Sequence, residues 1–198
     1  MKRTSFLYLV LFILFSCNGN EAKSAAETEN AGHATQENTK LADDTAIGRN
    51  TTEFVLGNEE VIYSFETKKG KKMVVVKNKN NAYIQYRFGS KGKIEMEFPA
   101  EKTKESWKQF KYNSYWRGGG KENAGMEIDN LQFTNKGYTY LIYRTYFAES
   151  EENSAGIIIT DSNKKETRIN GVPKTINGCI CNLEDTGLIE KTDIGLSF

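Results

Sequence analysis

Residues 82–98 read AYIQYRFGSKGKIEMEF, and this stretch decides the fold class. Side chains alternate over 82–88, with Ile84, Tyr86 and Phe88 on one face and Tyr83, Gln85 and Arg87 on the other. The alternation returns over 94–98, where Glu95 and Glu97 are expected to point outward into solvent. A period of two is that of a β-strand with one buried face. Residues 89–92, Gly-Ser-Lys-Gly, are typical of a turn, so the stretch predicts two antiparallel strands.

Short runs rich in aromatic and β-branched residues continue on both sides of this hairpin. We expect further strands at 61–65, 73–77, 131–133, 138–147, 156–160 and 167–169. The run 138–147 has apolar or aromatic side chains on both faces, which predicts a central strand. No long segment has helical periodicity, although 101–111 has room for one short helix. The predicted fold is therefore all-β, an antiparallel barrel or sandwich of about eight to ten short strands.

The N-terminus has the parts of an export signal. Lys2 and Arg3 precede an apolar run over 6–15 that is too short to span a bilayer. The sequence Leu14-Phe15-Ser16-Cys17 resembles the lipobox of bacterial lipoproteins. That resemblance implies removal of signal peptide 1–16, lipidation of Cys17 with palmitate and attachment to a membrane. By resemblance to lipoprotein sorting in proteobacteria, Asn18 in the next position implies the outer membrane. A secretory signal followed by an unrelated cysteine is the alternative.

Composition changes between the signal and the β-rich region. Residues 17–48 hold no aromatic side chain and predict a lipidated cysteine followed by a disordered tether. Residues 49–198 predict a single β domain of ordinary size. Within the tether, Asp44-Thr45-Ala46 resembles a bacterial O-glycosylation acceptor pattern, which makes Thr45 a candidate modification site.

Charge and histidine content exclude several function classes. The chain has 27 basic and 26 acidic residues, and this balance argues against nucleic acid as a partner. The single histidine, His33, lies in the tether. The β domain therefore has no Ser-His-Asp or Cys-His arrangement and no imidazole metal site. No Gly-rich phosphate loop is present. We expect no catalytic residues, no metal and no cofactor, although carboxylate, lysine or tyrosine chemistry is not excluded.

The segment 107–120 is the candidate binding region. It holds both tryptophans of the chain and ends in three consecutive glycines. Flat aromatic faces beside hydrogen-bond donors suit sugar rings or a protein hot spot. The candidate binding residues are Tyr115, Trp116, Arg117, Gly118, Gly119 and Gly120. In the alternative interpretation the aromatic residues fill the core and the glycines form a flexible loop.

Cys179 and Cys181 form a second candidate site. Two residues apart on a strand, they would point to the same face and could form a disulfide in an oxidising compartment. Two buried, reduced thiols or an intermolecular bridge are the alternatives.

Three motifs carry a resemblance to known proteins. They are Tyr83 to Gly89, Gly92 to Pro99 and Phe133 to Tyr140. They resemble a largely uncharacterised group of small exported bacterial β-domain lipoproteins with Tyr-Arg-Phe-Gly and Phe-x-Asn-x-Gly-Tyr-x-Tyr patterns. This resemblance covers roughly residues 59–160 and implies no activity.

A fainter resemblance is to the membrane-bound inhibitors of C-type lysozyme, which are small exported β-barrels. The chain lacks their Ser-Gly-Ser-Gly-Ala motif and their long-range disulfide. The sequence thus favours an envelope-anchored, non-enzymatic domain that binds an extracytoplasmic protein or glycan. A structural envelope component without a discrete ligand and a lysozyme inhibitor are the alternatives.

Overall fold

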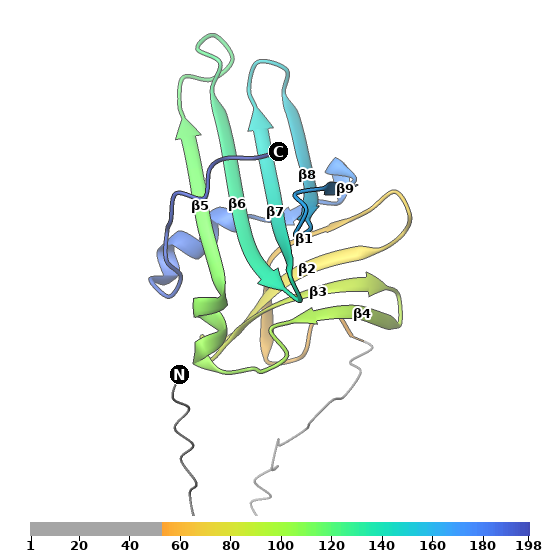
Figure 1. Cartoon of the computed structure of the whole chain (residues 1–198). Helices are drawn as coiled ribbons and strands as arrows, with labels where there is room; N and C mark the ends of the chain where they lie inside the picture. Colours follow the sequence, from red (N-terminus) through yellow and green to blue (C-terminus); the bar gives the residue numbers. More distant parts are fainter. Residues whose placement is uncertain (1–52) are drawn as a thin grey trace, which may run out of the picture. The chain divides into compact units, whose positions relative to one another are not determined.

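The computed structural model describes residues 53–198, which form two five-stranded antiparallel sheets (Figure 1). Residues 1–16, which are predicted to be a signal peptide, and Cys17, His33 and Thr45 lie outside the described residues. Over 53–198, no helix is long and apolar enough to cross a membrane. The sequence prediction of an all-β fold is confirmed, and of its two architectures the open, sandwich-like one is observed.

The first sheet contains the hairpin on which the prediction was based. Its strand order is β10-β1-β2-β3-β4. The strands are β1 Glu59–Glu66, β2 Lys72–Asn78, β3 Ile84–Ser90, β4 Lys93–Phe98 and the short β10 Asn177–Gly178. The β3–β4 turn is tighter than expected because the pairing continues to Ser90 and Lys93. A bulge lies between Phe88 and Gly89. The two strands approach closely there, because a Cβ on Gly89 would lie 2.2 Å from the carbonyl oxygen of Lys93, so the position requires glycine.

The second sheet has the order β5-β6-β7-β8-β9. Its strands are β5 Phe110–Arg117, β6 Met126–Asn135, β7 Tyr138–Phe147, β8 Glu152–Thr160 and β9 Glu166–Asn170. β7 is the middle strand, as its two apolar faces predicted. The hairpin before it turns at Lys136 and Gly137, whose φ angles of 50° and 81° fit a two-residue turn that matches the twist of the strands.

The core lies between the two sheets. Tyr63, Phe65 and Met73 of the first sheet and Leu131 and Ile142 of the second belong to one buried cluster. Three rings continue this cluster toward one end. Phe133 stacks on Phe98 with centroids 4.4 Å apart and on Tyr140 with centroids 4.9 Å apart. Each such pair adds about 0.5–1.5 kcal/mol beyond the area it buries.

Three short 3₁₀ helices complete the fold: η1 Lys104–Gln109, η2 Pro173–Thr175 and η3 Ile180–Thr186. The first lies inside the predicted helical stretch 101–111. The third corrects the expected position of the cysteines on a strand, because Cys179 caps η3 and Cys181 lies within it. The chain bends here because Gly178, with φ of 80°, ends the two-residue strand β10.

The C-terminal segment 187–198 crosses the second sheet on the face opposite to the first sheet (Figure 1). The Thr192 N–H donates to the Tyr112 carbonyl at 2.9 Å, and the side chain of Asn130 exchanges two hydrogen bonds with Ser197. The ring of Phe198 contacts that of Phe147. The segment therefore covers an apolar patch that includes Leu141.

Candidate functional site

The far ends of β5, β6, β7 and β8 extend beyond the place where the first sheet crosses them (Figure 1). The inner face of the second sheet, defined as the face that packs on the first sheet, is uncovered there. Exposure along β5 shows the change. Phe110 and Tyr112 are 2% and 0% exposed, whereas Trp116, which alternation places on the same face, is 72% exposed. A large apolar ring thus stands in solvent on a face that is core elsewhere.

Trp116 has a polar and aromatic neighbourhood. It pairs across the sheet with Glu127 on β6, which pairs in turn with Tyr146 on β7. Arg144, also on β7, donates to the carboxylates of Glu127 at 2.8 Å and Asp129 at 3.0 Å. The residues Trp116, Glu127, Arg144 and Tyr146 are called the tryptophan face below. A shallow hollow of about 200 Å³ lies against it, bordered by the glycines of the β5–β6 loop.

The β5–β6 loop is held in a defined shape. Arg117 donates from Nε and Nη2 to the carbonyl oxygen of Ala124, at 3.1 and 2.6 Å. Gly119 and Gly120 have φ angles of 111° and 61°, where a side chain is disfavoured. A Cβ on Gly118 would lie 2.8 Å from the indole of Trp116, so the ring rests against bare backbone. Gly118 therefore leaves room for the indole of Trp116, while Gly119 and Gly120 give the loop its shape.

These positions revise the predicted binding set. Trp116 and the three glycines come together at the hollow, but Tyr115 lies on the opposite face of β5, because neighbouring residues of a strand face opposite ways. The guanidinium of Arg117 closes the loop through Ala124. Trp107, by contrast, is 3% exposed and belongs to the core. Sequence reasoning missed Glu127, Arg144 and Tyr146, which lie on the two strands after β5 and reach Trp116 through strand register.

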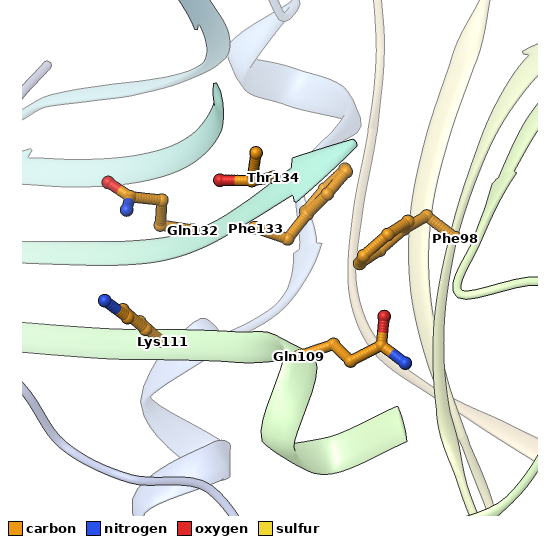
Figure 2. Close-up of a pocket in the computed structure, with 6 residues that line it drawn as sticks. All are labelled: Phe98, Gln109, Lys111, Gln132, Phe133 and Thr134. Atoms are coloured by element: carbon orange, nitrogen blue, oxygen red, sulfur yellow. The ribbon is translucent and has the colours of Figure 1, made fainter. Parts of the chain in front are cut away.

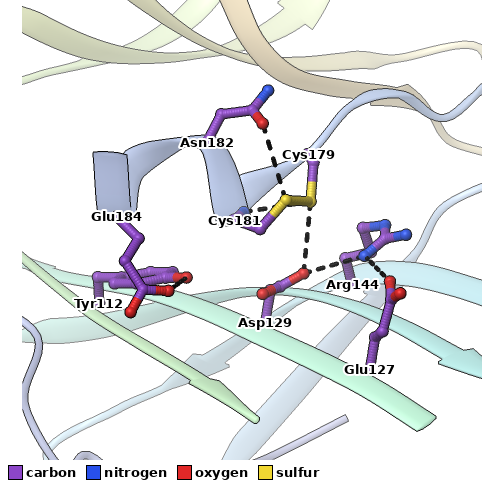
Figure 3. Close-up of a disulfide and its surroundings, with 8 residues drawn as sticks. All are labelled: Tyr112, Glu127, Asp129, Arg144, Cys179, Cys181, Asn182 and Glu184. Atoms are coloured by element: carbon purple, nitrogen blue, oxygen red, sulfur yellow. Dashed lines mark hydrogen bonds and ion pairs between the residues drawn. A yellow bond between two sulfur atoms is a disulfide. The ribbon is translucent and has the colours of Figure 1, made fainter. Parts of the chain in front are cut away.

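Cys179 and Cys181 are joined by a disulfide with an S–S distance of 2.13 Å. Cys181 is exposed and Cys179 is half-buried. Figure 3 shows the two sulfurs above β6, where Sγ of Cys179 lies 3.6 Å from Oδ2 of Asp129. Burial raises the pKa of Asp129, and the hydrogen bond from Arg144 opposes that rise without cancelling it.

Asp129, Cys179 and Cys181 are also the one group of potential metal ligands found over 53–198. Their ligand atoms lie within 4.8 Å of one another. The thiolate is the form of cysteine that binds metal, and a disulfide offers none. The group therefore does not fit a metal while the disulfide is intact.

A second hollow, of about 260 Å³, opens at the junction of the two sheets. Figure 2 shows Phe98 and Phe133 facing each other, with Gln109, Lys111 and Gln132 around them. The two phenylalanine rings already stack on one another and are 9% and 2% exposed. They therefore offer little free aromatic surface to a ligand, in contrast to Trp116.

A buried ionic network occupies the other face of the first sheet. Arg87 is fully buried and makes two 2.6 Å contacts to the carboxylate of Glu59. It also donates to Glu97 at 2.9 Å and to the carbonyl oxygen of Phe54. Glu97, expected to be solvated, is instead half-buried against this guanidinium. The side chains of Arg87 and Glu59 are both closed to solvent, so the pair stabilises the fold and presents no site to a ligand.

Comparison with models of known protein families, with curated proteins and with solved structures finds no match to this chain. Function is therefore argued from the site itself.

Proposed function

We propose that this chain is a lipid-anchored, exported protein whose β domain binds a glycan on the tryptophan face. The single observation that supports the proposal is the exposed indole of Trp116 on an otherwise buried face. Exposed aromatic surface beside fixed polar groups marks a binding site. Glu127, which pairs with Trp116 across the sheet, supplies carboxylate acceptors beside it, and hydroxyl groups on a flat sugar ring can donate to such acceptors.

The proposed location at a membrane rests on the N-terminal signal. Lipid on Cys17 would hold the domain at a membrane, with the outer membrane favoured by Asn18, and the tether would let it stand away from the surface. A glycan of the cell envelope or of its surroundings is then within reach. A structural role without a ligand and lysozyme inhibition have no observation of their own in residues 53–198.

The test is glycan binding by residues 18–198, the mature chain without its lipidated cysteine. A glycan array identifies the ligand, and tryptophan fluorescence measures affinity. Trp107 is buried and its indole N–H donates to the Asn81 carbonyl at 3.1 Å, so a fluorescence change reports on Trp116. We expect Trp116→Ala to weaken binding at least about tenfold, equivalent to about 1.4 kcal/mol.

The matched control is Tyr138→Ala, which removes an aromatic side chain that is 47% exposed next to a hairpin turn, away from the tryptophan face. It should bind like the parent. Equal affinity of Trp116→Ala and the parent would contradict the proposal. So would the absence of any bound glycan together with Trp116-dependent capture of a protein, which would make the partner a protein. A marked fall in thermal stability of Trp116→Ala would instead assign the ring to the core.

A further inference from the structure

The disulfide lies on the same inner face as the tryptophan face, and its two sulfurs differ in access. Cys181 is exposed at the start of η3, whereas Cys179 is half-buried between η3 and β6 (Figure 3). An incoming thiolate can therefore reach Sγ of Cys181 more easily than Sγ of Cys179. In such an attack Cys179 is the sulfur that leaves with the electron pair of the broken bond.

The leaving sulfur would appear beside a buried carboxyl group. Asp129 is 3% exposed, and its Oδ2 lies 3.6 Å from Sγ of Cys179. A thiolate and a carboxylate this close repel each other, so the pair is expected to hold one shared proton. Burial already raises the pKa of Asp129 in the disulfide form, which favours a protonated carboxyl group at this position.

The other charged and titratable groups near Asp129 come from five elements. Arg144 on β7 contacts Asp129 directly, and Glu127 on β6 shares that arginine. Tyr63 on β1, Tyr112 on β5 and Glu184 on η3 complete the surroundings, and the Tyr112 hydroxyl donates to Glu184 at 3.5 Å. Arg144 is the one cation of this set. It is engaged by two carboxylates, which leaves Asp129 as the nearest proton carrier to the sulfur.

We propose that the Cys179–Cys181 disulfide exchanges with thiols outside the cytoplasm, with Cys181 as the sulfur attacked and Asp129 as the proton carrier for Cys179. The substrate class is a cysteine thiol of an exported peptide or a small thiol. A thiolate RS⁻ attacks Sγ of Cys181, the Cys179–Cys181 bond breaks, and the mixed disulfide R–S–S–Cys181 forms. The Cys179 thiolate takes the proton shared with Asp129.

A second thiolate then attacks the R sulfur of the mixed disulfide and releases R–S–S–R and the Cys181 thiolate, which takes a proton from water. Two thiols are oxidised to one disulfide, and the protein disulfide is reduced to two thiols. The two electrons of that reduction come from the two substrate thiols.

The first experiment counts and locates reactive sulfurs in residues 18–198, where Cys179 and Cys181 are the only cysteines. The air-oxidised chain should show no free thiol, and an excess of reduced glutathione should expose two without unfolding it. Challenged with oxidised glutathione, Cys179→Ser should then form a mixed disulfide at Cys181 and release one reduced glutathione, at a rate roughly tenfold or more above that at which Cys181→Ser forms one at Cys179, because exposure controls access.

The second experiment tests the proton carrier. In the reduced Cys181→Ser background, the alkylation rate of Cys179 by iodoacetamide is followed against pH. Asp129→Asn removes the neighbouring negative charge and should move the rise in rate to lower pH. Glu95→Gln, a carboxylate removed from the exposed edge of the first sheet, should leave the profile in place. An unchanged pH profile of Cys179 alkylation in Asp129→Asn would contradict the role of Asp129 as proton carrier.

Three results would overturn the proposal. The first is two free thiols in the folded, air-oxidised chain. The second is a disulfide that glutathione reduces only after unfolding, or equal trapping rates at the two cysteines. The third is tight uptake of Zn²⁺ by the reduced chain that prevents re-oxidation, since Asp129, Cys179 and Cys181 would then be a metal site.

Discussion

Replacing Glu59 with Gln tests the buried ion pair. The carboxylate of Glu59 accepts two 2.6 Å contacts from Arg87, one from the backbone N–H of Leu56 at 2.8 Å and one from the hydroxyl of Tyr83 at 2.8 Å. Glutamine keeps the size of the side chain but removes its charge. The guanidinium of Arg87 would then stay buried, with Glu97 as the one carboxylate contact described for it.

The expected loss follows from full burial of both side chains. Both are 0% exposed, and removing one partner of such a pair costs about 3–5 kcal/mol because the other charge is left uncompensated. For a domain of this size the loss corresponds to a fall in Tm of roughly 10 °C. Replacing both residues, Glu59→Leu with Arg87→Met, should cost less than either single change, because no buried charge then remains unpaired.

The effect should depend on pH in a defined direction. Burial by itself would raise the pKa of Glu59, but the hydrogen bonds from Arg87, Leu56 and Tyr83 outweigh burial and hold the pKa below its ordinary value of 4.5. A depressed pKa in the folded state contributes stability that is present above pH 4.5 and is lost as the pH falls through the folded-state pKa. The difference in free energy of unfolding between the parent and Glu59→Gln should therefore narrow as the pH falls below 4.5.

Urea unfolding from pH 7 downward measures this gap. The control is Glu95→Gln on β4, the strand next to that of Arg87; its carboxylate pairs with Lys71 in solvent, so the substitution should have no resolvable effect on the midpoint. A loss of unfolding free energy below about 1 kcal/mol at pH 7 would refute the reasoning, because the ion pair would then be exposed to solvent. A difference between parent and variant that stays constant down to pH 3 would refute it as well.

Two further predictions concern the ends of the chain. Asn130 is fully buried and exchanges two 2.9 Å hydrogen bonds with Ser197, so Asn130→Ala should cost roughly 1–2 kcal/mol and speed amide exchange over 193–198. The control Asn113→Ala removes a more exposed 3.3 Å bond to Gly195 and should cost less, and unchanged exchange in Asn130→Ala would show that the segment is held by its apolar contacts. At the other end, Cys17→Ser should abolish incorporation of radiolabelled palmitate in cells, and retained label would disprove the lipid anchor.

The candidate site was only partly predictable from sequence. Trp116 could be singled out from the sequence because three glycines follow it closely in the chain. Alternation along β5 could also have separated Tyr115 from Trp116, because it is a local property. The partners on β6 and β7 could not be found in this way, since Glu127 and Tyr146 reach Trp116 through strand register. Asp129 meets Cys179 across fifty residues, so no local pattern could pair them.

Eight of the ten strands and the central position of β7 could be predicted from the sequence alone, because side-chain alternation acts over a few residues, whereas β5 and β10 were not predicted. The choice of sandwich over barrel, the course of 187–198 and the surroundings of the disulfide were decided by the tertiary structure. Arg87 illustrates the difference. Its strand and face were predicted, but a face is exposed or buried according to what packs on it, and here distant Glu59 and Phe54 cover it.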